Sequence, residues 1–140
     1  MNDINKYLKS DLFAKELGIE LLSVKEGKAK VKMKITQNHL NSAGTVHGGA
    51  IFALADFAFE AASNSYGTLA LGINVSISYF KAVSSGILYA EAKEISFNPK
   101  LATYLIDITN ERGDIIALFQ GTVYRKKDKL SDNYITKNNK

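Results

Sequence analysis

Two adjacent glycines precede the longest apolar stretch of the chain, residues 50–66. Ala, Phe and Leu are dense in that stretch and neither proline nor internal glycine interrupts it before its end, which predicts a helix. Gly48 and Gly49 would lie at its first turn, where unpaired N–H groups meet the positive end of the helix dipole. Such an entrance can hold an anion or an oxyanion. The alternative is that the glycines only permit a tight junction between loop and helix.

The same apolar stretch contains two acidic residues, Asp56 and Glu60, one helical turn apart. A carboxylate in apolar surroundings has a raised pKa and can act as a base. The alternative is a polar stripe, because Asp56, Glu60, Ser63 or Asn64, and Gly67 fall on one side of a helix. The combination of the carboxylate with the glycine entrance favours a catalytic site.

The glycine entrance and Asp56 are too far apart to act together from one helix. Gly49 and Asp56 are seven residues apart, which corresponds to about 10 Å along a helix. An oxyanion donor and an attacking group must each lie within about 3 Å of the same carbonyl group. We therefore expect the entrance of one chain to meet Asp56 of another in a two-fold dimer, so that the monomer is inactive.

Common cofactor and metal signatures are absent from the sequence. It contains no phosphate-binding loop, no dinucleotide fingerprint and no nucleophile elbow. It has no cysteine, which excludes disulfides and thiolate catalysis. His39 and His47, eight residues apart, form a poor metal pair, and His39 is predicted to be structural. We predict neither a metal nor a separate cofactor.

The overall composition is that of an ordinary globular protein. The 140 residues leave room for one domain with a real core. The chain is 46% hydrophobic and 23% charged. No apolar run approaches the roughly 20 residues of a membrane-spanning helix, and residues 1–10 lack the apolar core of a signal peptide. We expect a cytoplasmic protein without a membrane partner.

The net charge of +4 comes from the C-terminal end of the chain. Residues 125–140 contain six basic and two acidic residues, so the remainder is neutral. A basic end of this kind is typical of a solvated terminus, and we predict no nucleic-acid partner. We divide the chain into one domain, residues 1–125, and a basic, flexible tail, residues 126–140.

The remaining pattern predicts the elements that surround the central helix. A short amphipathic helix is predicted from Asp3, with Ile4, Leu8 and Leu12 on one face, to near Gly18. Short turns predict that the strands after the central helix form an antiparallel meander. The fold class is therefore α+β, with an antiparallel sheet around one long helix. The predicted strands cover residues 19–24, 28–35, 69–80, 87–97, 103–109 and 115–124.

A longer motif surrounds the candidate residues. It reads Asn41-x-x-Gly44-Thr45-x-His47-Gly48-Gly49, then Phe52-x-Leu54-Ala55-Asp56-x-Ala58-Phe59 and Asn64-Ser65-x-Gly67. It continues in residues 77–81 and 113–117. This pattern resembles the phenylacetic acid degradation (PaaI) type of hotdog-fold acyl-CoA thioesterase over residues 15 to 125.

The resemblance implies hydrolysis of an aryl-CoA or of a short or medium acyl-CoA to the free acid and CoA. Asp56 would be the base or the nucleophile, and the backbone of Gly48 and Gly49 would polarise the carbonyl group. Asn41 and His47 would position the carbonyl group or the attacking water. CoA is then part of the substrate, and the resemblance implies a homodimer as the minimal active unit, often joined into a homotetramer.

The sequence departs from this family in two places. Ala82 follows Lys81 where many relatives carry proline. Gly72 stands where some relatives place a Ser or Thr that assists the water, and Asn74 or Ser76 could substitute for it. These departures concern the substrate and the second helper rather than the general chemistry.

Substrate binding is predicted from less specific residues. Lys81 and Lys100 are candidates for the CoA phosphates, although a lysine at a strand end is often only solvated. The acyl specificity depends on which aromatic side chains line the pocket: Phe52, Phe59, Tyr66, Tyr79 and Phe80.

Two other functions suit the same fold. Acyl-chain dehydratases use a catalytic histidine paired with an acid across the interface, whereas His47 here precedes the helix. A non-catalytic acyl-CoA sensor is the second alternative, although its usual DNA-binding segment is missing.

Overall fold

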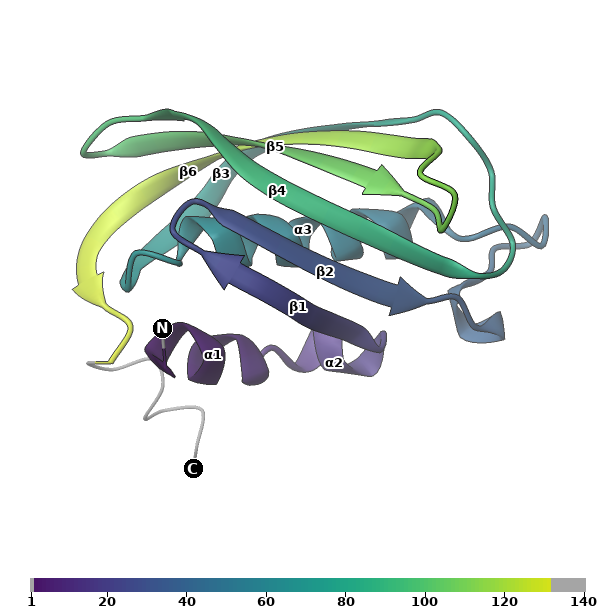
Figure 1. The fold of residues 1–140 in the computed structure, drawn as a ribbon, viewed down its shortest axis with the longest axis horizontal. Helices are drawn as coiled ribbons and strands as arrows, with labels where there is room; N and C mark the ends of the chain where they lie inside the picture. The colour runs from purple at the N-terminus through teal and green to yellow at the C-terminus, as the bar shows by residue number, and fades with distance from the viewer. Residues whose placement is uncertain (1, 132–140) are drawn as a thin grey trace.

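The structure is a computed structural model, and it describes residues 2–131. Figure 1 shows the sheet arching over helix α3, with α1 and α2 below the sheet edge that β1 forms. This confirms the predicted α+β architecture. The elements, in chain order, are α1 (Asn2–Lys9), α2 (Leu12–Glu16), β1 (Ile19–Lys25), β2 (Lys28–Lys34), the 3-10 turn η1 (Gln37–His39), α3 (Gly48–Ser63), β3 (Thr68–Tyr79), β4 (Ile87–Phe97), β5 (Leu101–Thr109) and β6 (Ile115–Lys129).

Helix α3 is the centre of the core. It begins at Gly48, so both glycines lie in its first turn as predicted, and most of its side chains are buried. Leu54 and Ala58 are fully buried, as is Ile106 on the sheet above them. Alanines on α3 allow close packing of the sheet, and each large buried apolar side chain contributes about 1.5–3 kcal/mol. No helix within residues 2–131 is long and apolar enough to cross a membrane.

The sheet is antiparallel throughout, with the strand order β1-β2-β4-β5-β6-β3. In β2, Ala29, Val31 and Met33 face the core, and the alternating lysines face outward. The alternation predicted for this strand is therefore confirmed.

The predicted meander is wrong at β3. This strand does not pair with β4 but lies at the far edge beside β6, with Tyr79 opposite Ala117. The connection over residues 80–86 carries the chain past the ends of β6 and β5, and this length permits the crossing (Figure 1). Pairing β4 with β2 buries Leu88 and Ala90 against the core.

The prediction of a single N-terminal helix is also wrong. The chain breaks after α1, and the Asp11 carboxylate accepts a hydrogen bond of 3.0 Å from the Ala14 N–H at the start of α2. Aspartate competes for backbone N–H groups and so begins a new helix. Ile4 and Leu8 are buried as predicted, but Leu12 is 77% exposed.

Strand β6 extends beyond its predicted end. It runs to Lys129, which pairs with Thr68, and the next residue, Leu130, is fully buried. Residues 126–129, predicted as part of a flexible tail, therefore belong to β6, whose end is paired with the start of β3 through Lys129. The rest of the predicted tail, residues 132–140, lies outside the described residues.

Candidate active site

The loop that leads into α3 is organised by Asn41. Its side-chain oxygen accepts hydrogen bonds from the N–H groups of Ala43 (3.0 Å) and Thr45 (3.1 Å). Gly44 has a φ of 78°, a left-handed conformation that favours glycine. Asn41 therefore shapes the loop that delivers His47, and a direct contact of Asn41 with a substrate stays a prediction.

His47 is the N-cap residue of α3. Its Nδ1 accepts a hydrogen bond of 2.8 Å from the Gly49 N–H. Because Nδ1 accepts, the neutral ring carries its proton on Nε2. One of the two predicted oxyanion donors is thus already paired, and it becomes available only when the exposed His47 ring moves away.

The Gly48 N–H is the donor that remains at the entrance. It makes no hydrogen bond within residues 2–131. The Tyr79 hydroxyl, at the end of β3, donates to the Gly48 carbonyl at 2.9 Å. A Cβ at Gly48 would lie 3.2 Å from the Tyr79 ring. Glycine is therefore needed for this close approach, which fixes the helix entrance against β3.

Asp56 lies two turns further along α3, at a small cavity of 180 Å³. Glu60 and Gly72 line the same cavity. Although the Asp56 side chain is exposed in the single chain, loss of contact with water raises its pKa, and the nearby Asp11 carboxylate raises it further. The Asp56 carboxylate makes no hydrogen bond within the described residues. A carboxylate in this state can accept a proton or attack a carbon atom.

Glu60 is held in a different protonation state. Desolvation, a hydrogen bond with Asp11 and repulsion from Asp11 and Asp56 raise its pKa to about 9. Glu60 is therefore protonated at neutral pH, while Asp56 carries the weaker perturbation. Neighbouring carboxyl groups with separated pKa values are typical of catalytic sites.

Replacing Glu60 by glutamine is expected to stabilise the protein at alkaline pH. The folded-state pKa is raised, so the stability that Glu60 contributes is present below pH 4.5 and is lost as the pH rises through about 9. The amide keeps a hydrogen-bond donor but never ionises. Glu60→Gln should raise the free energy of unfolding at pH 8 to 9 by on the order of 2 kcal/mol, with little effect at pH 5.

Urea unfolding at the two pH values measures this difference. Glu16→Gln, on the exposed side of α2, is the matched control and should show no such pH dependence. Equal effects of Glu60→Gln at both pH values would show that Glu60 is not held protonated.

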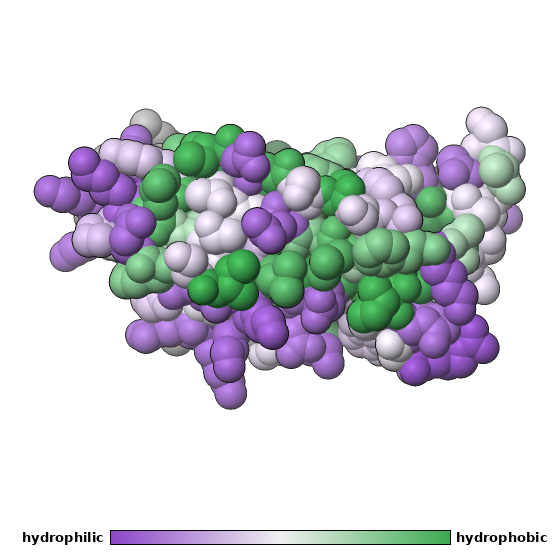
Figure 2. Space-filling view, turned by 90° about the horizontal axis from the view of Figure 1, so that it is seen from above, coloured by the Kyte–Doolittle hydropathy of each residue, from purple (hydrophilic) through white to green (hydrophobic). Residues whose placement is uncertain are grey.

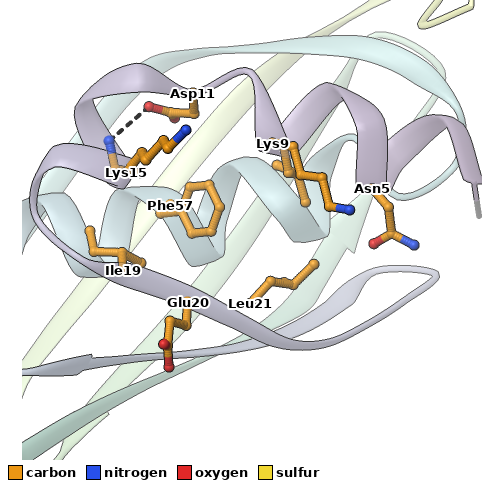
Figure 3. Close-up of a pocket in the computed structure, with 10 residues that line it drawn as sticks. Asn5, Lys9, Asp11, Lys15, Ile19, Glu20, Leu21 and Phe57 are labelled. Carbon is orange, nitrogen blue, oxygen red and sulfur yellow. Dashed lines mark hydrogen bonds between the residues drawn. The ribbon is translucent and has the colours of Figure 1, made fainter.

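A larger cavity of 660 Å³ lies between α1, α2, β1 and α3 (Figure 3). The Phe57 ring projects into it from α3, and Lys9 and Lys15 extend along it from the two N-terminal helices. Asp11 lines this cavity too. The N-terminal helices therefore form a wall next to Phe57, the residue that follows Asp56.

The space above Gly72 is taken by an aromatic ring. A Cβ at Gly72 would lie 3.0 Å from Phe59, and one at Gly121 would lie 2.7 Å from it. This explains why Ser or Thr is absent at position 72. Asn74 and Ser76 pair with Thr122 and Gln120, which places them on the outer face of the sheet, away from Asp56 of the same chain.

The predicted phosphate ligands lie at opposite ends of the sheet. Lys81 follows β3 near the helix entrance, and its Nζ lies 2.9 Å from the Asp114 carboxylate. Lys100 lies in the turn before β5, near the start of β3, where its carbonyl accepts the Arg125 N–H. One chain therefore does not bring these two lysines to the same phosphate group.

The aromatic residues predicted to line the acyl pocket also lie in different parts of the structure. Phe52 and Phe59 pack against Phe119 in the core, with ring centroids 5.3 and 5.6 Å away. Tyr66 stacks with Phe97 at the other end of α3. Tyr79 and Phe80 remain exposed near the entrance.

Sequence reasoning missed two contacts that shape the site. Tyr79 and Gly48 are 31 residues apart, and Asp11, the N-cap of α2, is 49 positions before Glu60 of α3 in the sequence. No local pattern connects residues at such separations. The only signal was the presence of a lone acidic residue between the two halves of the N-terminal segment, which predicts a helix cap.

Comparison with known proteins gives consistent matches. Residues 43–117 match the Thioesterase superfamily. The chain is 52% identical over 118 residues to a protein of Archaeoglobus fulgidus named as a candidate esterase, covering 84% of this chain and 77% of that protein. It is 36% identical over 118 residues to the acyl-coenzyme A thioesterase PaaI of Escherichia coli, covering 84% of each.

A solved structure shows that the fold is also similar to that of a PaaI protein. The structure of the E. coli PaaI protein from the phenylacetic acid degradation operon superposes with a TM-score of 0.82 at 32% identity. The match covers 89% of this chain and 96% of the E. coli chain. The similarity therefore extends over nearly the whole described fold.

Proposed function

This chain belongs to the thioesterase superfamily, as a hotdog-fold hydrolase of the PaaI type, and from that premise we propose that it hydrolyses acyl-CoA thioesters at a site shared by two chains. One observation carries the proposal. A single helix presents an unpaired Gly48 N–H at its entrance and a basic carboxylate, Asp56, two turns later.

In the proposed reaction the thioester carbonyl oxygen accepts a hydrogen bond from the Gly48 N–H. The positive end of the α3 dipole stabilises the charge that develops on this oxygen. The Nε2–H of His47 is a second donor at the same entrance. Movement of the His47 ring would also free the Gly49 N–H.

Asp56 drives the attack on the carbonyl carbon in one of two ways. It takes a proton from a water molecule that forms the new C–O bond, or its own oxygen forms that bond and gives a mixed anhydride, which water then opens. In both routes the C–S bond breaks, and CoA leaves as a thiolate that acquires a proton. The raised pKa of Asp56 suits the role of a base near neutral pH.

The edge strand β3 supports the proposal of a dimer. Residues 71–76 are exposed on both faces of this strand, although three of them, Leu71, Ile73 and Val75, are large and apolar. An exposed edge of this kind readily pairs with another strand. A second copy of β3 is the partner that a two-fold axis provides.

The register of such a pairing would complete the site. Within one chain, β3 approaches Asp56 at Gly72 and the helix entrance at Tyr79. An antiparallel pairing of two β3 strands centred on Ser76, with the bulge between Gly72 and Asn74, sets Gly72 opposite the partner subunit's Tyr79. Asp56 of one chain then faces the Gly48 entrance of the other.

The outer face of the sheet suggests a further interface for a homotetramer. Figure 2 looks onto this face and shows apolar side chains across its middle, with hydrophilic side chains toward the ends and along the lower edge of the view. Leu71, Tyr124 and Leu101 are exposed neighbours on β3, β6 and β5. Apolar surface of this kind favours association.

An assay of free-thiol release over a panel of acyl-CoAs tests the function. We expect hydrolysis of at least one aryl-CoA or short or medium acyl-CoA, with a kcat in the range of about 1 to 10³ s⁻¹ that is usual for enzymes. The panel should contain acyl-CoAs of increasing acyl length and acyl-CoAs with phenyl rings. Circular dichroism should first confirm that the protein is folded.

The other outcomes of this assay are informative. Binding of an acyl-CoA without thiol release from any member of the panel would favour a sensor and contradict the enzyme. Loss of water from a 3-hydroxyacyl-CoA without thiol release would favour a dehydratase.

A further inference from the structure

The small cavity beside Asp56 extends along α3 toward the C-terminal end of the helix. Its lining residues on α3 include Asp56, Glu60 and Ser63, which follow one another at intervals of about one turn. The cavity therefore spans about 10 Å of helix. Residues 70–72 of β3 form a second wall. The cavity begins at the candidate base and leads away from the entrance at Gly48 of the same chain.

The two walls are joined at the far end of the cavity by Asn64. This side chain is fully buried, and its Oδ1 accepts the Ala70 N–H at 2.9 Å. Its Nδ2 donates to the Glu60 carbonyl oxygen, also at 2.9 Å. The start of β3 is thus held against the end of α3, which fixes the spacing of the two walls there.

Two aromatic side chains complete the lining of the cavity. Phe59 is buried and packs against Phe119 and Tyr104 in the core, so its ring has little room to move. Tyr7 comes from α1, which is neither of the two main walls, and its side chain is half-buried. Tyr7 is therefore the large lining side chain whose replacement can change the size of the cavity without opening the core around Phe59.

The volume and the chemistry of the cavity suit a small, uncharged acyl group. Its volume is 180 Å³. An engineered apolar cavity of about 150 Å³ holds benzene, so this one has room for a phenyl ring or a chain of about six carbon atoms. Phe59 and Leu71 offer apolar surface, and Glu60 is protonated at neutral pH. Asp56 is then the only charged group among the described residues that line it.

We propose that the acyl group of the substrate occupies this cavity between α3 and β3, and that Tyr7 limits the length of the acyl group. This inference rests on the proposed function, which places the thioester carbonyl group at Asp56. CoA is attached on one side of that carbonyl group and is too large for 180 Å³, so the acyl group on the other side enters the cavity. The N-terminal helix α1 thereby selects the substrate.

The test compares kcat/KM for butanoyl-, hexanoyl-, octanoyl-, decanoyl- and phenylacetyl-CoA. Tyr7→Ala enlarges the cavity and should raise kcat/KM for decanoyl-CoA relative to butanoyl-CoA on the order of ten-fold. Tyr7→Trp should do the reverse: a loss on the order of ten-fold for hexanoyl- and phenylacetyl-CoA relative to butanoyl-CoA. Opposite shifts from one position cannot arise from a general loss of folded protein.

Phe13→Ala is the matched control. It also removes an aromatic ring from the N-terminal helices, but Phe13 is 67% exposed and lines neither this cavity nor the larger one. It should leave the ratio of kcat/KM between long and short acyl groups unchanged. Tyr7→Leu, which keeps an apolar side chain against the core, replaces Tyr7→Ala if the alanine protein unfolds.

A binding measurement separates this inference from the proposed function. Isothermal titration calorimetry with the same acyl-CoAs in the Asp56→Asn background gives Kd values without hydrolysis. Tyr7→Ala in that background should tighten decanoyl-CoA binding relative to butanoyl-CoA, again on the order of ten-fold.

Each outcome supports or overturns the role of Tyr7. A shift in the Kd ratio, with no thiol release by the unmodified protein, would support the acyl cavity and contradict the hydrolase. Unchanged ratios of both kcat/KM and Kd in the Tyr7 variants would overturn the inference. An equal loss for all acyl groups would assign Tyr7 a purely structural role and overturn it as well.

Discussion

Asp56→Asn is expected to lower kcat for acyl-CoA hydrolysis by about 10²- to 10⁴-fold. Asparagine has the size of aspartate but neither accepts the proton of water at neutral pH nor forms an anhydride. The Asp56 side chain is exposed and unpaired within the described residues, so its replacement leaves the core intact. KM should change little, because the contact acts on the transition state. Free-thiol release with the best acyl-CoA of the panel measures the loss.

A matched control for this variant is Asp107→Asn. Asp107 lies on β5 opposite Leu118, on the outer face of the sheet. It should keep the activity of the unmodified protein. If Asp56→Asn retains more than a tenth of that activity while its melting temperature is unchanged, Asp56 is neither the base nor the nucleophile.

Mixing two inactive variants is expected to restore about a quarter of the normal activity. Gly48→Val is the partner of Asp56→Asn, because its Cβ would meet the Tyr79 ring at 3.2 Å and block the entrance. Valine keeps the backbone N–H, but its side chain blocks access to this donor, and loss of one oxyanion donor costs about 10²- to 10³-fold. Random exchange of chains makes about half of the dimers mixed, and each mixed dimer has one intact and one doubly defective site.

This experiment needs proof that the chains exchange. Native mass spectrometry of differently tagged variants shows the mixed dimer directly, and each variant taken alone through the same exchange is the control. A mixture that contains mixed dimers but stays inactive would rule out a site shared between chains. Activity in Gly48→Val alone would instead show that the entrance is not needed.

Local patterns determined much of the fold. The apolar run of α3, the two glycines before it and the alternation in β2 each reside within one element, where periodicity and backbone preferences act over a few residues. The distance between Gly49 and Asp56 followed from the rise of a helix alone. For the same reason the sequence predicted a site divided between two chains before any tertiary contact was known.

The position of β3 could not be read from local patterns. Its own residues form a strand wherever the strand pairs, so the choice between β4 and β6 depends on the whole sheet. Only the completed sheet shows that residues 71–76 remain exposed at the edge. This exposure is what supports a second copy as the partner.

The sequence by itself determined which groups are present at the candidate site: a glycine entrance, a carboxylate on the same helix and the spacing between them. The tertiary structure decided how these groups are held, hydrogen-bonded and protonated. Tyr79 fixes the entrance through Gly48, His47 occupies the Gly49 N–H, and loss of contact with water, with repulsion from Asp11, raises the pKa of Asp56. Hydrogen bonds and Coulomb interactions depend on distance in space, and folding brings α1, α2 and β3 to α3 from distant parts of the sequence.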